Sequence, residues 1–89
     1  MRKNKQHLKE HVLKALGEAL RNRRVELELT QEEIGKAADL HRTYVTDVEK
    51  GVRNLSFLTL MRLATALLCP LSLIMIEKEK ILDSWTLRR

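Results

Sequence analysis

The chain has 89 residues, and its 17 Lys and Arg against 12 Asp and Glu give a formal charge of +5, so it has room for one small domain. Hydrophobic residues make up 44% of the chain but aromatic residues only 3%. The core must therefore be aliphatic, a composition that favours helices over sheets. A chain this short buries only about 60 to 65% of its unfolded surface, so we expect help from a partner subunit. We expect no enzyme activity, because no paired carboxylates and no nucleophile with its base stand out.

Nothing in the composition points to secretion, a membrane or a bound cofactor. The single cysteine, Cys69, cannot form a disulfide within the chain and is more typical of a small core residue than of a redox sensor. Residues 1–5 lack the apolar stretch of a signal peptide, and no apolar run approaches the roughly 18 residues of a transmembrane helix. His7 and His11 stand four residues apart without a third metal ligand nearby. We therefore expect a cytoplasmic protein without metal or cofactor.

The positive charge is concentrated at the start of the chain. Residues 1–24 hold eight Lys and Arg against two Glu, whereas residues 25–50 hold three against seven acidic residues. Residues 1–10 are polar without a pattern, which predicts a flexible basic N-terminal arm. From His11 onward apolar residues recur at helical spacing, which predicts a first helix that ends near Leu27 or Glu28.

A second, short helix is predicted from Gln31 to about Ala38. Thr30 and Glu33 have the spacing of a capping box, in which the Thr hydroxyl accepts from the Glu amide and the Glu carboxylate accepts from the Thr amide. Gly35 costs on the order of 1 kcal/mol in a helix interior relative to Ala. We therefore expect another stretch of backbone to pack closely against it.

A third helix is predicted from about Arg42 to Lys50, after a tight connection through Asp39. Asp tolerates the left-handed conformation that such a connection needs, and Gly51 fits the position that follows the last helical residue. Val45 and Val48 face inward. The opposite face is polar and carries Thr43, Thr46, Asp47 and Lys50.

Two more helices follow, and the last one extends beyond what a compact core requires. Ser56 is a predicted cap for the fourth helix, which ends before Pro70, and a fifth begins near Leu71. Residues 11–76 then form the domain, and residues 77–89 extend the fifth helix as a dimer contact. A two-fold dimer would place its third helices about 34 Å apart, one turn of B-DNA. The residues expected in that contact are Ile74, Ile81, Leu82 and Trp85.

The second and third helices together have the form of a helix-turn-helix. The second helix of such a pair can enter the major groove of double-stranded DNA, which is about 12 Å wide, and its polar side chains can meet base edges there. Over residues 13–76 the chain resembles the Cro and lambda-repressor (XRE-type) helix-turn-helix family. The residues 29–34, Leu-Thr-Gln-Glu-Glu-Ile, resemble the opening of that family's second helix. The residues 42–45 and 53–55, with Glu49, resemble controller proteins of bacterial restriction-modification systems and related small dimeric repressors.

The resemblance implies an all-α, five-helix DNA-binding domain and a role for individual residues. Arg24 and Glu49 match a structural ion pair between the first and third helices. Tyr44 is as well suited to packing as to DNA, and Asp47 either accepts from cytosine N4 or repels wrong sequences. The base contacts implied are Arg42, Thr43, Thr46 and Asp47. Gln31 either contacts phosphate or braces the third helix. The backbone contacts implied are Gln31, His41, Tyr44, Lys50, Arg53 and Asn54.

Four residues depart from the family pattern. Arg23 stands where a hydrophobic residue is usual, and Glu28 and Asp39 stand where Gly is common. His41 replaces the usual Ser or Asp cap of the third helix, which puts the cap in doubt and indicates a phosphate contact instead.

The function expected is therefore a homodimeric regulator that binds a palindromic operator without cofactor or catalysis, within a restriction-modification operon if the closer resemblance holds. Such a protein either excludes RNA polymerase from a promoter or recruits it. The alternative is the antitoxin of a toxin-antitoxin module, whose tail, Ile81 to Arg89, covers a toxin.

Overall fold

The computed structural model describes residues 2–87, and side chains from residue 8 to residue 85. This part of the chain contains five α-helices and no strand, as the sequence predicts. The predicted bounds of the second and third helices agree with the structure. The helices are α1 (Arg2–Glu26), α2 (Gln31–Ala38), α3 (Arg42–Lys50), α4 (Phe57–Ala66) and α5 (Leu71–Leu87).

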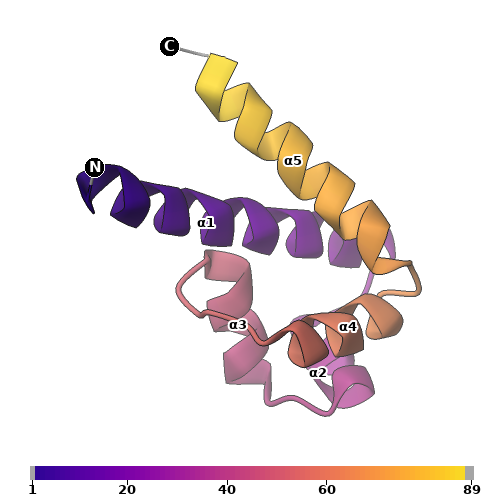
Figure 1. Ribbon diagram of the computed structural model, residues 1–89. Coiled ribbons are helices and arrows are strands. Elements are labelled where there is room, and N and C mark those ends of the chain that lie inside the picture. The colour runs from indigo at the N-terminus through magenta and orange to yellow at the C-terminus, as the bar shows by residue number, and fades with distance from the viewer. Residues whose placement is uncertain (1, 88–89) are drawn as a thin grey trace.

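The two long helices lie side by side, and the three short ones pack beneath them (Figure 1). α1 packs against α5 on one side and α3 on the other, and α2 packs against α3 and α4. The core between them is aliphatic, as the low aromatic content requires. It includes Leu20 from α1, Ile34 from α2, Val45 from α3, Leu63 from α4 and Ile74 from α5.

The first helix begins at Arg2 rather than at His11. Residues 2–10 have no apolar periodicity, but they contain neither Pro nor Gly and are rich in Lys, Gln and other good helix formers. Once α1 is nucleated by its packed half, adding residues to its end costs little. The predicted start of the first helix at His11 is therefore corrected, while the flexibility of residues 1–10 stays a prediction.

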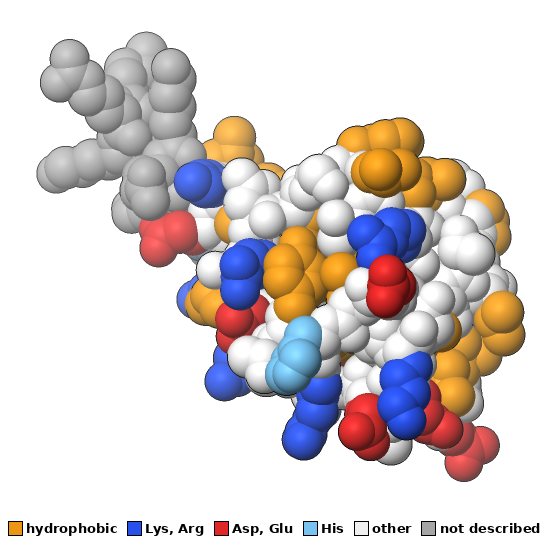
Figure 2. All heavy atoms as spheres, turned by 90° about the horizontal axis from the view of Figure 1, so that it is seen from below, with side chains coloured by type: hydrophobic (Ala, Val, Ile, Leu, Met, Phe, Trp, Pro, Cys, Tyr) orange, Lys and Arg blue, Asp and Glu red, His pale blue; other side chains and the backbone are white. Residues whose placement is uncertain are grey.

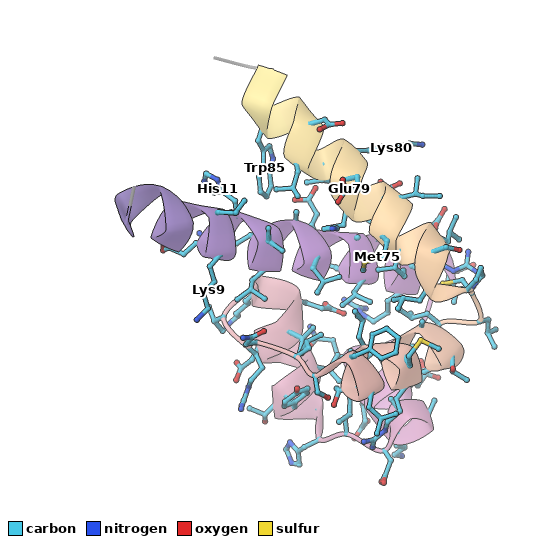
Figure 3. All side chains as sticks on the ribbon, viewed as in Figure 1. Lys9, His11, Met75, Glu79, Lys80 and Trp85 are labelled. Carbon is cyan, nitrogen blue, oxygen red and sulfur yellow. The ribbon has the colours of Figure 1, made fainter. Side chains whose placement is uncertain are left out.

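The end of α5 packs on α1 of the same chain. Ile74 and Ile81 are only 2% and 8% exposed, because they belong to the core of a single chain. Leu82 and Trp85 are half-buried beside them, and the Trp85 ring meets the His11 ring edge-on with centroids 6.0 Å apart (Figure 3). The expected dimer contact through Ile74 and Ile81 is wrong, since α1 of the same chain already covers this face of α5.

The connections rely on local caps and on an arginine of α1. The capping box of Thr30 and Glu33 is present, and Gly51 ends α3 with φ 77°. Arg23 of α1 donates to the Leu67 and Leu68 carbonyls at the end of α4, at 3.1 and 3.2 Å. An Arg in place of the usual apolar residue thus satisfies carbonyls that a helix end leaves free.

No single helix among the described residues is long and apolar enough to cross a membrane. α4 and α5 reach the required length and hydropathy only when taken together, across a bend of 102°.

Close backbone contact occurs at two glycines. A Cβ on Gly35 would lie 2.6 Å from the Leu40 carbonyl oxygen, which meets the expectation of a nearby backbone. A Cβ on Gly17 of α1 would collide with the Val48 carbonyl and lie 2.6 Å from that of Glu49. Gly17 therefore lets α1 touch the end of α3 directly.

We expect Gly17→Ala to lower the free energy of unfolding by about 2 kcal/mol, because the new methyl group would push α1 away from α3. In an unobstructed helix the same change would raise stability by about 1 kcal/mol. Denaturant unfolding followed by circular dichroism measures the difference. Glu18→Ala, at the exposed neighbouring position, is the control. A Gly17→Ala chain as stable as the wild type would contradict the close contact.

Candidate nucleic-acid interface

The connection between α2 and α3 fixes how α3 begins. Asp39 ends α2 in the left-handed conformation, with φ 58° and ψ 49°. His41 caps α3, because its Nδ1 accepts from the Thr43 amide at 3.0 Å. The doubt about this cap is corrected: an imidazole nitrogen fills the role of the usual oxygen. In a neutral ring the proton then sits on Nε2, which leaves a donor on this exposed side chain.

A second clamp on this turn comes from α4 and was missed in the sequence. Arg62 Nε donates to the Ala38 carbonyl at 3.0 Å, and its Nη2 donates to the Asp39 carbonyl at 2.8 Å. Arg62 is the single charged residue in the α4 segment. A lone charged residue in an otherwise uncharged helix was the feature of the sequence that could have indicated this contact.

The first turn of α3 presents free side chains to solvent. Val45 and Val48 are 2% and 3% exposed and seat the helix on the core. Arg42 and Thr43 are exposed, as is Lys50 at the other end of the helix. Of the four residues predicted to meet bases, these first two are therefore the most accessible.

The other two predicted base contacts are already engaged within the chain. Thr46 is half-buried and its hydroxyl donates to Gln31 Oε1 at 2.7 Å. Asp47 is half-buried and accepts from Arg53, which is described below. The predicted set is thus split into a free pair and an occupied pair.

A polar network ties α3 to α1 and α2. Arg24 donates to both carboxylate oxygens of Glu49, at 2.7 and 3.0 Å, and to the Leu29 carbonyl at 2.8 Å. Gln31 Nε2 donates to the same carboxylate at 3.0 Å, and its Oε1 accepts from Thr46. The resemblance implied the pair of Arg24 and Glu49, and a role for Gln31 either at phosphate or as a brace of α3; the structure shows Gln31 bonded to both Glu49 and Thr46.

The core of this network is shielded from water. The side chains of Arg24 and Glu49 are 13% and 5% exposed. The hydrogen bond to Glu49 raises the pKa of Arg24 above its ordinary value, against burial that lowers it, and the charge of Glu49 adds to the rise. Arg24 therefore stays charged, and α3 is held by charge-assisted bonds of fixed geometry.

Arg53, from the loop after α3, folds back over the helix. Its guanidinium lies 4.7 Å from the centre of the Tyr44 ring, and its Nη2 is 3.4 Å from Asp47 Oδ2. Tyr44 thus packs within the chain as a platform for Arg53. Asn54, next along the loop, is exposed.

Charges of both signs share the helix-turn-helix side of the molecule. Figure 2 looks at this side from below and shows acidic and basic side chains interspersed, with hydrophobic side chains gathered at the upper and right edges. The mixture reflects the excess of acidic residues in residues 25–50. Affinity for DNA here has to come from a few placed cations rather than from a broad positive field.

This arrangement is that of a helix-turn-helix DNA-binding domain, in which α2 and α3 form the helix-turn-helix. Residues 20–74 match the family model described as Helix-turn-helix. The chain belongs to the XRE-type helix-turn-helix family, and it is a DNA-binding regulator close to the restriction-modification controller proteins.

Three known proteins are similar to this chain. The control protein C.BamHI of Bacillus amyloliquefaciens is 41% identical over 39 residues, which are 44% of this chain and 48% of that protein; the match thus spans about half of that relative's length. The restriction-modification controller protein C.AhdI of Aeromonas hydrophila is 37% identical, with a TM-score of 0.69 over 70% of this chain and 94% of that one. The clp gene regulator ClgR of Corynebacterium glutamicum is 25% identical, with a TM-score of 0.84 over 86% of this chain and 82% of that one.

We expect Glu49→Ala to lower the free energy of unfolding by about 2 to 4 kcal/mol, because it leaves the shielded Arg24 without its partner. Arg24→Met together with Glu49→Leu should recover most of that loss, since no charge is then left unpaired. Denaturant unfolding of both variants tests this. If the double variant is no more stable than Glu49→Ala, the unpaired charge is not the cause.

Proposed function

We propose that this chain is a sequence-specific transcriptional regulator that binds a palindromic operator as a homodimer, in the manner of a restriction-modification controller. The observation that carries the proposal is the first turn of α3, where Arg42 and Thr43 stand exposed on a helix that α1 and α2 hold in place. A rigid helix with free polar side chains at its start is the geometry that reading a major groove requires.

In this reading, Arg42 donates two hydrogen bonds to guanine O6 and N7, and Thr43 places its methyl group against a thymine methyl. His41 Nε2 at the start of α3, Lys50 at its other end and Asn54 in the following loop reach the phosphates, which position the domain without specifying sequence. Gln31 acts as a brace for α3, because both ends of its amide are held by Glu49 and Thr46.

We expect Arg42→Ala to weaken binding to the operator by roughly 10- to 100-fold, and binding to random duplex by only a few-fold, because a lost base contact costs about 1 to 3 kcal/mol of discrimination. The operator is first obtained by selecting bound sites from random duplexes, and we expect a symmetric motif. Titration of labelled duplexes at fixed salt then gives both affinities. Arg21→Ala removes an equally exposed arginine from α1 and is the control. Equal losses on both duplexes would remove Arg42 from base reading.

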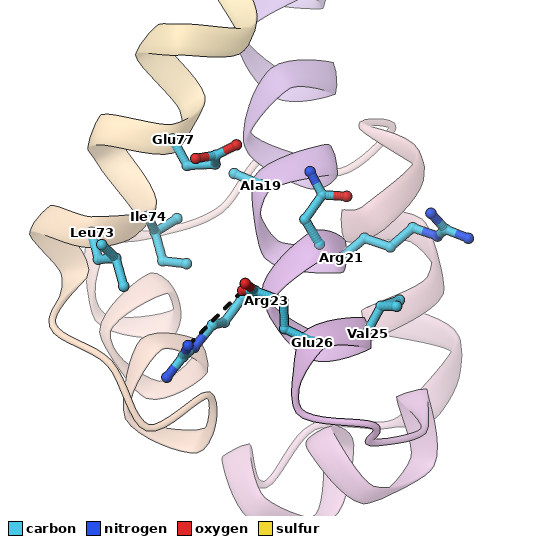
Figure 4. Close-up of a pocket in the computed structure, with 9 residues that line it drawn as sticks. Ala19, Arg21, Arg23, Val25, Glu26, Leu73, Ile74 and Glu77 are labelled. Atoms are coloured by element: carbon cyan, nitrogen blue, oxygen red, sulfur yellow. Dashed lines mark ion pairs between the residues drawn. The ribbon is translucent and has the colours of Figure 1, made fainter.

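The homodimer is proposed to form through the exposed apolar side chains of α4 and the start of α5. Residues 57–76 carry six of the nine exposed large hydrophobic residues in the described part of the chain. A groove of about 520 Å³ beside α5 adds to this surface, with Leu73 and Ile74 facing Arg23 of α1 across it (Figure 4). Apolar surface gathered in this way is typical of a protein interface. The six residues are Phe57, Leu58, Met61, Leu68, Leu73 and Ile76.

We expect Leu58→Glu combined with Ile76→Glu to convert the dimer into a folded monomer, because four buried carboxylates would repel one another across a two-fold interface. Sedimentation equilibrium measures the association, and circular dichroism verifies the fold. Trp85→Ala is the matched control: it should lower stability and leave the dimer intact, since Trp85 packs on its own α1. A dimer lost in Trp85→Ala and kept in the double variant would reverse the placement.

The restriction-modification role is supported by the similarity to C.BamHI and C.AhdI. The antitoxin alternative rested on an unpartnered C-terminal tail. Ile81 is buried and Trp85 meets His11 within the chain, so residues 81–85 no longer favour it.

A further inference from the structure

The contact of Arg53 with Asp47 is weak in comparison with the other arginine contacts near α3. Arg62 is fixed by two backbone carbonyls at 3.0 and 2.8 Å, and Arg24 by two carboxylate bonds and a carbonyl. Arg53 has one carboxylate oxygen at 3.4 Å and the face of Tyr44, and its side chain is 47% exposed. Ion pairs of such exposure contribute little net stability. Arg53 is therefore held in a defined place but is readily released.

The partner of Arg53 lies where a negative charge is unfavourable for DNA binding. Asp47 is on the polar side of α3, one turn after Thr43, and its side chain is 32% exposed. While Arg53 neutralises the Asp47 carboxylate, that carboxylate repels DNA phosphates only weakly. When Arg53 moves to a phosphate, Asp47 is left facing DNA without a donor, and an unpaired charge in an interface is costly.

One base edge can relieve that cost. The amino group of cytosine N4 is a donor in the major groove and pairs with a carboxylate. A site with cytosine opposite Asp47 lets Arg53 leave for the backbone while Asp47 gains a new partner. A site without it keeps Arg53 on Asp47 or leaves the carboxylate unpaired.

We propose that Asp47 is a specificity-determining residue that exchanges Arg53 for a base, so that the phosphate contact of Arg53 forms fully only on the correct sequence. This inference rests on the proposed function, because it assigns a mechanism of discrimination to the same interface. Tyr44 is the positioning residue, because its ring holds the Arg53 guanidinium beside Asp47, on the side of α3 proposed to face the DNA.

The test compares Asp47→Asn, Arg53→Gln and the double variant on random duplex at several salt concentrations. We expect Asp47→Asn alone to bind random duplex about tenfold more tightly, with a salt dependence steeper by about one phosphate contact, because Arg53 is then always free. In the Arg53→Gln background the same change should raise the affinity less than about twofold. Both residues lie outside the core, so the variants are expected to fold.

Asp39→Asn is the matched control, since it removes the same charge from a fully exposed side chain next to α3. It should raise random-duplex affinity about twofold at most. Equal gains from Asp47→Asn with and without Arg53 would mean simple repulsion of phosphates and would overturn the exchange. No gain from Asp47→Asn would overturn it as well. A wild-type chain that prefers no sequence would overturn the proposed function, whatever the coupling between the two residues.

Discussion

The charged contact between Arg24 and Glu49 is the constraint on which the rest of the interface depends. It joins the first helix to the third with two short bonds in a shielded site. Two further bonds hold this ion pair: Arg24 donates to the Leu29 carbonyl just before the second helix, and the Gln31 amide, at the start of that helix, donates to Glu49. Because the partners of each charge are fixed in direction, the third helix can neither rotate nor slide without breaking several bonds at once.

Direct backbone contact complements this polar anchor. The missing side chain at Gly17 allows α1 to rest on the last carbonyls of α3, and Gly35 allows the same for the chain leading to α3. α3 is therefore fixed at its end by α1 and at its start by the turn that His41 and Arg62 cap. A short helix of nine residues would not be stable alone. Its neighbours hold it in a single orientation, and this orientation fixes where the exposed side chains of its first turn lie.

Local chemistry was predictable from the sequence, whereas long-range packing was not. The bounds of α2 and α3 followed from a capping box and a glycine, whose effects act within a few residues. The start of α1 was misplaced, because apolar spacing was used as the sign of a helix where propensity alone sufficed. The packing of α5 on α1 was missed for a different reason: His11, which meets Trp85, lay within the predicted first helix, but helical spacing does not report which helices lie against each other. The stacking of Arg53 on Tyr44 joins a loop to a helix face, and no spacing rule reports such a contact.

Three residues other than glycine adopt the left-handed conformation: Glu28, Asp39 and Leu68, each with φ near 57° among the described residues. At each of these positions a residue with a Cβ lowers the stability of the fold by roughly 1 kcal/mol relative to Gly. The fold thus carries a backbone cost at three of its corners, which the packing of its helices outweighs. Sequence drift at these corners toward Gly or Asn would be neutral or favourable, whereas drift toward Val, Ile or Thr would not. At Glu28 and Asp39 a change to Gly or Asn is expected to raise heat resistance without removing a side chain that we propose to contact DNA or a second subunit.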